Sequence, residues 1–311
     1  MRKQFVITLV IMAISAITVA AQNPPTLTIV TETPGLPSEL WYGAPPTGIK
    51  VKPLRFRPCT ATPCPPGQPV PITIDDSDFF VQQQYIDFLT RFPDTGGFND
   101  WMTFLKGCNG DANCLYAVNG RRTITSRGFF LSQEFPLKGG YVFRFYRASF
   151  GQAFAKLPTY PDMIAGMNSV TGATADEVQQ KRTAFAANWI LRTDFLALYP
   201  RSLTPTLFVD NISATAGVTL ANRNQIISDL TAGGNTDAAR GVAMRAIADS
   251  AEVQNREFNP SFVFMQYIGY LRRAPDQEGY LDWLDYLNNN PTDVDTMVWG
   301  FVAGAEYRNR F

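Results

Sequence analysis

From residue 72 onward, apolar positions recur three or four residues apart between segments that begin with helix-start residues. Phe185 and Trp189 lie on one such apolar stripe, at the spacing of a helix face. Thr174 stands three residues before Glu177, which is the pattern of a capping box. Alternating apolar and polar positions, which are typical of strands, are scarce in this part of the chain. The pattern therefore predicts an all-α body.

The preceding segment, residues 22–71, has a different pattern because it holds 13 of the 22 prolines. A helix cannot continue through proline at that density. Apolar residues partly alternate with polar ones from Thr26 to Thr33 and from Ile49 to Arg57, as in short strands. We predict an extended, Pro-rich arm with short β-structure, pinned by a local disulfide between Cys59 and Cys64.

Residues 1–21 have the pattern of a secretory signal peptide. Arg2 and Lys3 precede an uncharged apolar stretch, and small residues at positions 19–21 form a cleavage pattern before Gln22. A membrane anchor is the alternative, but the stretch is short for a span and polar residues follow it. No later apolar run reaches the length of a span. We therefore expect a secreted, periplasmic or cell-surface protein with no membrane span after signal cleavage.

One segment of the helical body is repeated. The stretches Phe80 to Leu105 and Phe262 to Leu287 align without a gap, and 13 of the 26 positions are identical. Self-similarity of this kind indicates duplicated structural units. In each copy an apolar helix face leads to a proline, which disfavours helix in the residue before it. The pattern predicts a helix, a tight turn and a second helix.

The residues shared by the two copies fit structural roles. Asp94 can cap the second helix, Gly97 lets the helices approach closely, and Trp101 fills the space between them. We expect stacked hairpins that bury the aromatic side chains Tyr85, Trp101, Tyr267 and Trp283. The repeat motif comprises Tyr85, Arg91, Pro93, Asp94, Gly97, Trp101 and Glu134 in the first copy, and Tyr267, Arg273, Pro275, Asp276, Gly279, Trp283 and Glu306 in the second.

A third helix closes each copy, since the stretch from Phe129 to Phe135 resembles that from Phe301 to Tyr307. Acidic residues recur 54 to 60 positions apart at Glu134, Asp194, Glu252 and Glu306. This spacing favours four divergent three-helix units that form a compact helical array. We divide the chain into 1–21, the signal peptide; 22–71, the arm; 72–200, the first helical repeat pair; and 201–311, the second helical repeat pair.

The motif Tyr-x-x-x-Leu-x-Arg-x-Pro-Asp-x-x-Gly-x-x-x-Trp, closed by a helix with Glu134-Phe135 or Glu306-Tyr307, resembles the bacterial domain of unknown function 4214. The resemblance is specific in the two outer units and fainter between them. It implies a small helical module of exported and surface-associated bacterial proteins, without an assigned activity. The same motif is similar, more distantly, to phycobilisome linker domains. An insertion that holds Cys108 and Cys114 departs from the pattern and lengthens the first unit.

Cys108 and Cys114 are close in sequence, and in an oxidising compartment a local disulfide is the simplest pairing. A metal site is the alternative, but the spacing is not Cys-x-x-Cys and the chain has no histidine. Residues 109–113 superficially resemble a calcium loop but fail the EF-hand template, which leaves only other calcium geometries open. We predict no metal and no cofactor.

The charge balance, 27 basic against 27 acidic residues, gives no electrostatic case for a nucleic-acid partner. The pairs Arg121-Arg122 and Lys181-Arg182 are expected to be solvated. Without histidine, Ser-His and Cys-His nucleophile arrangements are excluded, and the sequence contains no P-loop and no G-x-S-x-G motif. An enzyme would have to rely on carboxylate chemistry.

Arg91 and Asp94 form a polar pair in the turn, and Arg273 and Asp276 repeat it. Such a pair can grip a ligand carboxylate or sugar hydroxyls, or it can simply stabilise the turn. Repetition in both copies favours the structural role. We therefore expect a secreted or cell-surface helical module that binds or scaffolds a protein or glycan without catalytic activity. The alternative is an extracellular polysaccharide-acting enzyme with paired carboxylates.

Overall fold

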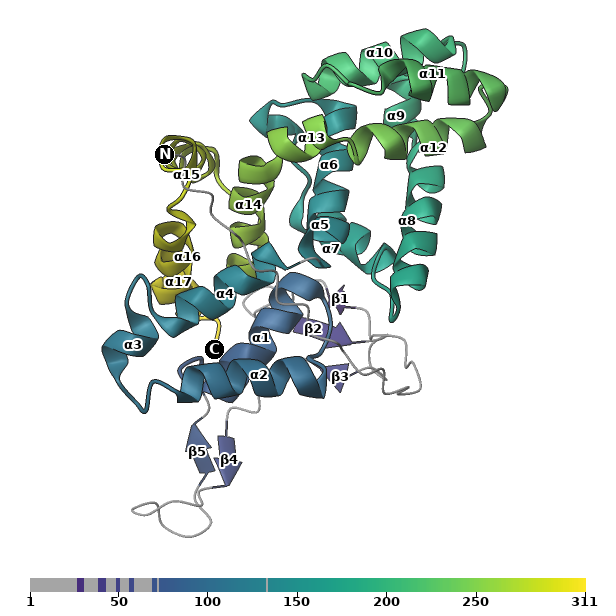
Figure 1. Ribbon diagram of the computed structural model, residues 1–311. Coiled ribbons are helices and arrows are strands. Elements are labelled where there is room, and N and C mark those ends of the chain that lie inside the picture. The colour runs from purple at the N-terminus through teal and green to yellow at the C-terminus, as the bar shows by residue number, and fades with distance from the viewer. Residues whose placement is uncertain are drawn as a thin grey trace, which may run out of the picture.

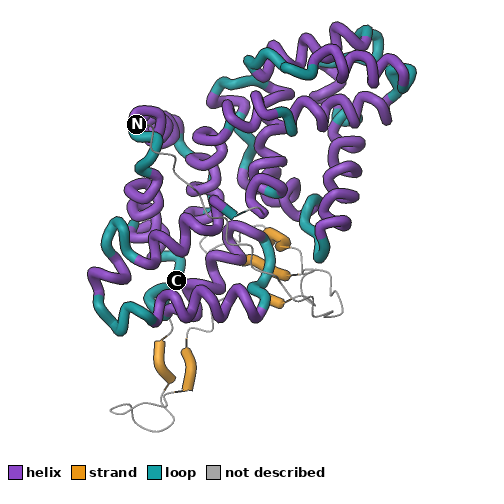
Figure 2. The backbone as a smooth tube through the Cα atoms, in the orientation of Figure 1, coloured by secondary structure: helices purple, strands orange, loops and turns teal. Residues whose placement is uncertain are grey.

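The computed structural model describes residues 27–30, 39–42, 49–50, 56–58, 69–71, 73–132 and 134–311. The predicted signal peptide and the predicted Cys59–Cys64 disulfide lie outside the described residues. From residue 73 onward the described chain forms helices and their connections, without a strand (Figure 2). The all-α body predicted from the hydrophobic pattern is therefore confirmed. Within the described chain, no helix combines the length and apolar character needed to cross a membrane.

Short strands are present in the segment predicted to be an arm. The first three form an antiparallel sheet, and the last two form a separate antiparallel pair. Their bounds are Leu27–Val30 (β1), Glu39–Tyr42 (β2), Ile49–Lys50 (β3), Phe56–Pro58 (β4) and Pro69–Pro71 (β5). Most of residues 22–71 lie outside the described residues, so the arm as a whole stays a prediction.

The body consists of four repeats, each with three main helices and a short closing helix. The first repeat contains α1 (Ser77–Leu89), α2 (Thr95–Lys106), α3 (Ala112–Tyr116), α4 (Arg121–Leu131) and α5 (Glu134–Leu137). The second contains α6 (Gly139–Phe150), η1 (Phe154–Lys156), α7 (Tyr160–Ser169), α8 (Ala175–Trp189) and α9 (Thr193–Leu198). Helix α3 belongs to the insertion and has no counterpart in the other repeats.

The third and fourth repeats follow the same plan. The third contains α10 (Pro205–Ala216), α11 (Arg223–Ala232), α12 (Asp237–Ala248) and α13 (Ala251–Arg256). The fourth contains α14 (Phe258–Gln266), which continues into the π-helical η2 (Tyr267–Leu271), then α15 (Gln277–Asn289), α16 (Val294–Ala303) and α17 (Ala305–Arg308). Each of the four recurring acids lies in the first turn of a short closing helix.

The repeats do not pack in their order along the chain. Helix α4 of the first repeat packs against α16 of the fourth, while α6 and α8 of the second pack against α10 and α12 of the third (Figure 1). Phe88 and Tyr270, with ring centroids 4.8 Å apart, join the first repeat to the fourth. Phe143 and Phe264, 5.1 Å apart, join the second to the fourth. Contacts between repeats therefore cross the predicted boundary between 72–200 and 201–311.

Ion pairs are buried where the repeats meet. The Asp87 carboxylate accepts hydrogen bonds from Arg272 and Arg310 of the fourth repeat, at 3.1 and 3.0 Å. Glu257 pairs with Arg147 of the second repeat at 3.1 Å. Burial raises the pKa of the Glu257 carboxyl, although the charge of Arg147 acts in the opposite direction. Removing one partner would leave an unpaired buried charge, so these contacts are sensitive to mutation.

Candidate functional site

The repeat-motif aspartates cap the second helix of their hairpins, as the sequence predicts. The Asp94 carboxylate accepts a hydrogen bond from the backbone N–H of Gly97 at 2.8 Å, and Asp276 does the same for Gly279 at 2.8 Å. A carboxylate at this position satisfies a backbone donor that has no partner within the helix. These hydrogen bonds lower the pKa of both carboxyls.

The motif arginines join the turn of the first and the fourth repeat to the closing helix of the same repeat. Arg91 donates two hydrogen bonds to the Glu134 carboxylate, at 3.0 and 2.9 Å, and one to the carbonyl oxygen of Phe92 at 3.0 Å. In the fourth repeat Arg273 binds Glu306 in the same way, at 2.7 and 3.1 Å. The guanidinium is therefore already engaged with the turn and the closing helix. This geometry favours the structural role over a ligand notch.

The recurring acids of the middle repeats are engaged as well. Asp194 accepts two hydrogen bonds from Arg192, at 2.9 and 2.6 Å. Glu252 accepts one from the backbone N–H of Ala221 at 3.0 Å. The four recurring carboxylates are thus distributed one per repeat and each has a partner inside the protein.

The motif glycines and tryptophans have different environments. A side chain at Gly97 would collide with the Tyr85 hydroxyl oxygen, so this glycine permits the close approach of α1 and α2. Tyr85 is buried, as predicted. Trp101 is only half-buried, and it lies on Gly128 of α4, where an added Cβ would come within 2.6 Å of the indole. The prediction that Trp101 is buried within the hairpin was therefore wrong, because the indole packs on Gly128 of α4 and keeps part of its surface exposed.

The fourth repeat repeats this environment. Tyr267 is buried, and a side chain at Gly279 would collide with its hydroxyl oxygen. Trp283 is half-buried rather than buried, with Gly300 beside it. Pro275 is buried at the turn. The equivalent contacts of Trp101 and Trp283 indicate that Gly128 and Gly300 belong to the motif, which the sequence comparison missed.

The predicted disulfide between Cys108 and Cys114 is present, with the two Cα atoms 5.5 Å apart. It closes the insertion just before the end of α3. Asp111 caps α3 by accepting hydrogen bonds from the backbone N–H groups of Asn113 and Cys114, at 2.8 and 3.1 Å. Among the described residues, no group of three or more His, Cys, Asp and Glu side chains gathers at one point that would suit a metal ion.

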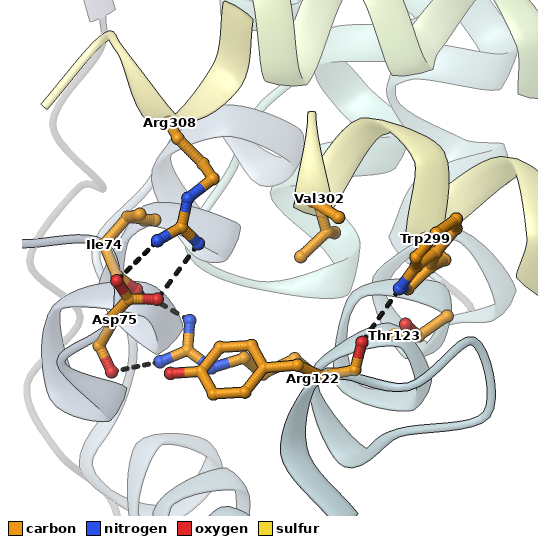
Figure 3. A pocket seen from close by; sticks show the side chains of 9 residues that line it. Ile74, Asp75, Arg122, Thr123, Trp299, Val302 and Arg308 are labelled. Carbon is orange, nitrogen blue, oxygen red and sulfur yellow. Dashed lines mark hydrogen bonds and ion pairs between the residues drawn. The ribbon is translucent and has the colours of Figure 1, made fainter. Parts of the chain in front are cut away.

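A pocket of about 410 Å³ lies between the insertion and the fourth repeat. Figure 3 shows Asp75 and Arg308 at one side of it and Trp299 at the other. Its lining residues are Ile74, Asp75, Tyr116, Arg122, Thr123, Trp299, Val302, Ala303 and Arg308. None of these residues was predicted from the sequence to be a site residue. They come from segments more than two hundred positions apart, and no local pattern links them.

Arg122 forms part of the pocket wall and is just 2 % exposed. It donates a hydrogen bond to the carbonyl oxygen of Ile74 at 2.7 Å and another to that of Asp75. Its guanidinium lies between the rings of Phe80 and Tyr116, 4.5 and 4.9 Å from their centroids. Burial lowers the pKa of Arg122, although nearby Tyr116 and Asp75 act in the opposite direction.

The prediction that the Arg121-Arg122 and Lys181-Arg182 pairs are solvated was wrong for the second residue of each pair. Arg182 is buried, and its guanidinium binds the Asp249 carboxylate at 2.8 and 2.7 Å. Adjacent residues of a helix point in different directions, so one of two neighbouring cations can face the core. There its charge is met by carbonyl or carboxylate oxygens, as buried charges require.

The polar side of the pocket is an exposed ion pair. Arg308 donates to both oxygens of the Asp75 carboxylate, with an Nη1 to Oδ1 distance of 3.0 Å. Partial burial acts to raise the pKa of Asp75, but the hydrogen bonds and the charge of Arg308 outweigh it, so the pKa is lowered. Burial raises the pKa of the Tyr116 hydroxyl, which leaves it protonated and able to donate.

The aromatic part of the pocket comes from two repeats. Trp299 on α16 donates its indole N–H to the backbone carbonyl oxygen of Tyr116 at 2.8 Å. Both side chains keep 37 % of their surface exposed. The pocket therefore combines aromatic surface on one side with a hydrogen-bond donor and acceptor, Arg308 and Asp75, on the other.

Residues 244–311 match a family model. It is that of DUF4214, a domain of unknown function. The DUF4214 match runs from the end of α12 through the whole fourth repeat, in agreement with the resemblance seen in the motif. It includes the pocket residues Trp299, Val302 and Arg308, while Asp75, Tyr116 and Arg122 lie outside it. Comparison with curated proteins and with solved structures found no match.

Proposed function

We propose that the chain is a secreted or cell-surface binding or scaffolding module without catalytic activity. The pocket between the insertion and the fourth repeat is then its binding site, and a protein or glycan of the cell surface is its partner. The predicted signal peptide supports the location. The lining of the pocket supports the role, because a few polar groups beside apolar surface are typical of ligand sites.

This proposal rests on the observation that the candidate carboxylates are bound by other groups of the protein. Polysaccharide hydrolysis by paired carboxylates needs two such groups about 5–10 Å apart, facing one substrate. The recurring acids of the four repeats are each engaged within their own repeat or its neighbour, as in the Arg91–Glu134 pair. The pocket wall contains a single carboxylate, Asp75, and it is paired with Arg308. These contacts favour a binding module over the enzyme alternative.

A combined binding and turnover assay tests the proposal. The purified protein is incubated with an array of surface polysaccharides, and bound protein and released reducing ends are measured on the same samples. We expect saturable binding without release of reducing ends. Turnover that disappears on a single Glu or Asp substitution, such as Glu134→Gln or Asp75→Asn, would overturn the proposal in favour of the enzyme.

A further inference from the structure

The Asp75–Arg308 pair presents a hydrogen-bond acceptor beside a donor. Their side chains remain 40 % and 38 % exposed, so a ligand can reach both. An ionised carboxylate accepts protons from hydroxyl groups, and a guanidinium donates to hydroxyl oxygens. Two adjacent hydroxyl groups on a ligand can therefore bind the pair together, one as donor and one as acceptor. Charge-assisted hydrogen bonds of this kind are stronger than those between neutral groups.

The pair also excludes some ligands. Asp75 already neutralises the exposed charge of Arg308, and Arg122 is buried with its terminal nitrogens bound to backbone carbonyl oxygens. An anionic ligand at this point would face the negative charge of Asp75 at close range, where like charges repel. The exposed charges of the pocket, those of Asp75 and Arg308, therefore balance each other, which favours a neutral, hydroxyl-rich ligand.

Trp299 supplies apolar surface on the side of the pocket opposite this pair. Its single donor, the indole N–H, is used by the Tyr116 carbonyl oxygen, so the exposed part of the ring offers only carbon surface to a ligand. Val302 lies between Trp299 and the ion pair (Figure 3). A ligand that fits must therefore have an apolar face on one side and hydroxyl groups on the other.

The pocket is held in place before any ligand binds. Arg122 fixes the backbone at Ile74 and Asp75, and its Nε has no hydrogen-bond partner among the described residues. Hydrogen bonds from Arg308 hold the Asp75 carboxylate. Preorganised groups lose little conformational freedom on binding. The volume of about 410 Å³ lies within the range of small-ligand sites.

We propose that this pocket binds a neutral pyranose sugar through two adjacent hydroxyl groups. The inference rests on the proposed binding function and names the ligand class for it. The hydroxyl groups bind Asp75 and Arg308, and the C–H face of the ring packs on Trp299. A pyranose combines an apolar face with an edge of neighbouring hydroxyl groups, which matches the arrangement of the wall.

The test is a titration of the full protein with neutral methyl pyranosides and neutral polysaccharides, followed by calorimetry. We expect saturable binding that Asp75→Asn and Trp299→Leu each weaken about tenfold or more, the effect of losing one charge-assisted hydrogen bond or one aromatic contact. Ala303→Phe provides a further variant, because Ala303 lines the pocket and is exposed. It obstructs the pocket without altering the core and should also weaken binding.

Matched controls come from the rest of the body. Asp210 and Arg223 form an ion pair with two hydrogen bonds, and both side chains are 39 % exposed, close to the values of the pocket pair. Asp210→Asn therefore controls for the loss of an exposed ion pair. Trp283→Leu controls for the loss of a half-buried tryptophan outside the pocket. Both controls should bind the sugar as the unmodified protein does.

The outcomes separate the ligand class from the function. If all three pocket variants bind the sugar as tightly as the unmodified protein, the proposed site is wrong, but the protein is still a binding module. If the protein binds only acidic saccharides, or does not bind any saccharide, the proposed ligand class is wrong. The proposed function is then tested by the combined binding and turnover assay alone. Release of sugar products, by contrast, would overturn the proposed function itself.

Discussion

The first and fourth repeats share the same turn and differ where they meet each other. Asp94 and Asp276 cap their helices at the same distance, and Arg91 and Arg273 bind the closing helix in the same way. The first repeat alone carries the disulfide-closed insertion with α3. Duplication preserved the hairpin, whereas the surfaces between the repeats diverged and formed the pocket.

A pair of equivalent glutamines shows the same divergence in the core. Gln84 donates to the Tyr307 hydroxyl at 3.3 Å, and its carbonyl oxygen accepts from Ser126 and, at 3.5 Å, from Tyr270. Gln266 is its counterpart and is fully buried, yet neither of its amide atoms has a partner among the described residues. The positions that correspond to the three partners are occupied by Phe135, Val298 and Phe88. The three hydroxyl groups that bind Gln84 therefore have no counterparts around Gln266.

Gly97→Ala and Gly279→Ala test what the two repeats have in common, and they should have the largest effect. Each added Cβ collides with a buried tyrosine hydroxyl, that of Tyr85 or Tyr267. We expect each variant to lose about 2 kcal/mol of unfolding free energy, since an overpacking cost of up to about 3 kcal/mol outweighs the helix preference of Ala, about 1 kcal/mol. Urea denaturation measures the loss.

Tyrosine variants provide the control for this prediction. Tyr85→Phe removes the colliding oxygen, so the double variant with Gly97→Ala should recover most of the stability. A clearly unequal loss in the two repeats, or a double variant as unstable as Gly97→Ala alone, would show that the hairpins are not equivalent.

Replacing both Cys108 and Cys114 by serine tests the feature that only the first repeat has. The bridge spans a sequence separation of 6, and closing so short a loop stabilises a protein by about 2 kcal/mol in the chain-entropy model. We expect a loss of that size, with faster amide hydrogen exchange confined to the insertion. The sugar affinity should also fall, because Tyr116 lies at the end of α3. Unchanged exchange in α3 would contradict this account.

Methionine substitution at the two glutamines tests the difference in the core. Gln84→Met leaves the hydroxyls of Ser126 and Tyr307 without a partner and should lose about 1–2 kcal/mol. Gln266→Met removes an unpartnered buried amide and should gain about 1 kcal/mol. Opposite shifts of the urea midpoint are the expected result. Equal losses at both positions would mean that Gln266 has a hydrogen-bond partner.

The hairpins could be predicted from the sequence because their determinants are local. Asp94 caps a helix that starts at the next residue, and Gly97 meets Tyr85 across one turn. The pocket could not be predicted, because Asp75 and Arg308 are 233 positions apart and become neighbours only when the first repeat packs on the fourth. The half-burial of Trp101 was missed for the same reason, since it depends on how α4 lies on the hairpin.

Glu134→Gln and Glu306→Gln address the smallest difference between the repeats. The Arg91–Glu134 pair has side chains 21 % and 29 % exposed, against 41 % and 54 % for Arg273–Glu306. Lys138, which is buried, also binds Glu134. We expect Glu134→Gln to lose about 1 kcal/mol, as for a charged hydrogen bond with partial burial. Glu306→Gln should lose about 0.5 kcal/mol or less, as for an exposed pair.

The pH dependence separates the two variants further. Burial acts to raise the pKa of Glu134, but hydrogen bonds from Arg91 and the charge of Lys138 outweigh it, so the pKa lies below the ordinary 4.5. A lowered pKa in the folded state means that the stabilisation is fully present above about pH 4.5 and is lost as the pH falls through the folded value. Urea unfolding at pH 7 and pH 3 measures this. The deficit of Glu134→Gln should shrink at pH 3, and a deficit that persists there would show that the charge of Glu134 does not stabilise the first repeat.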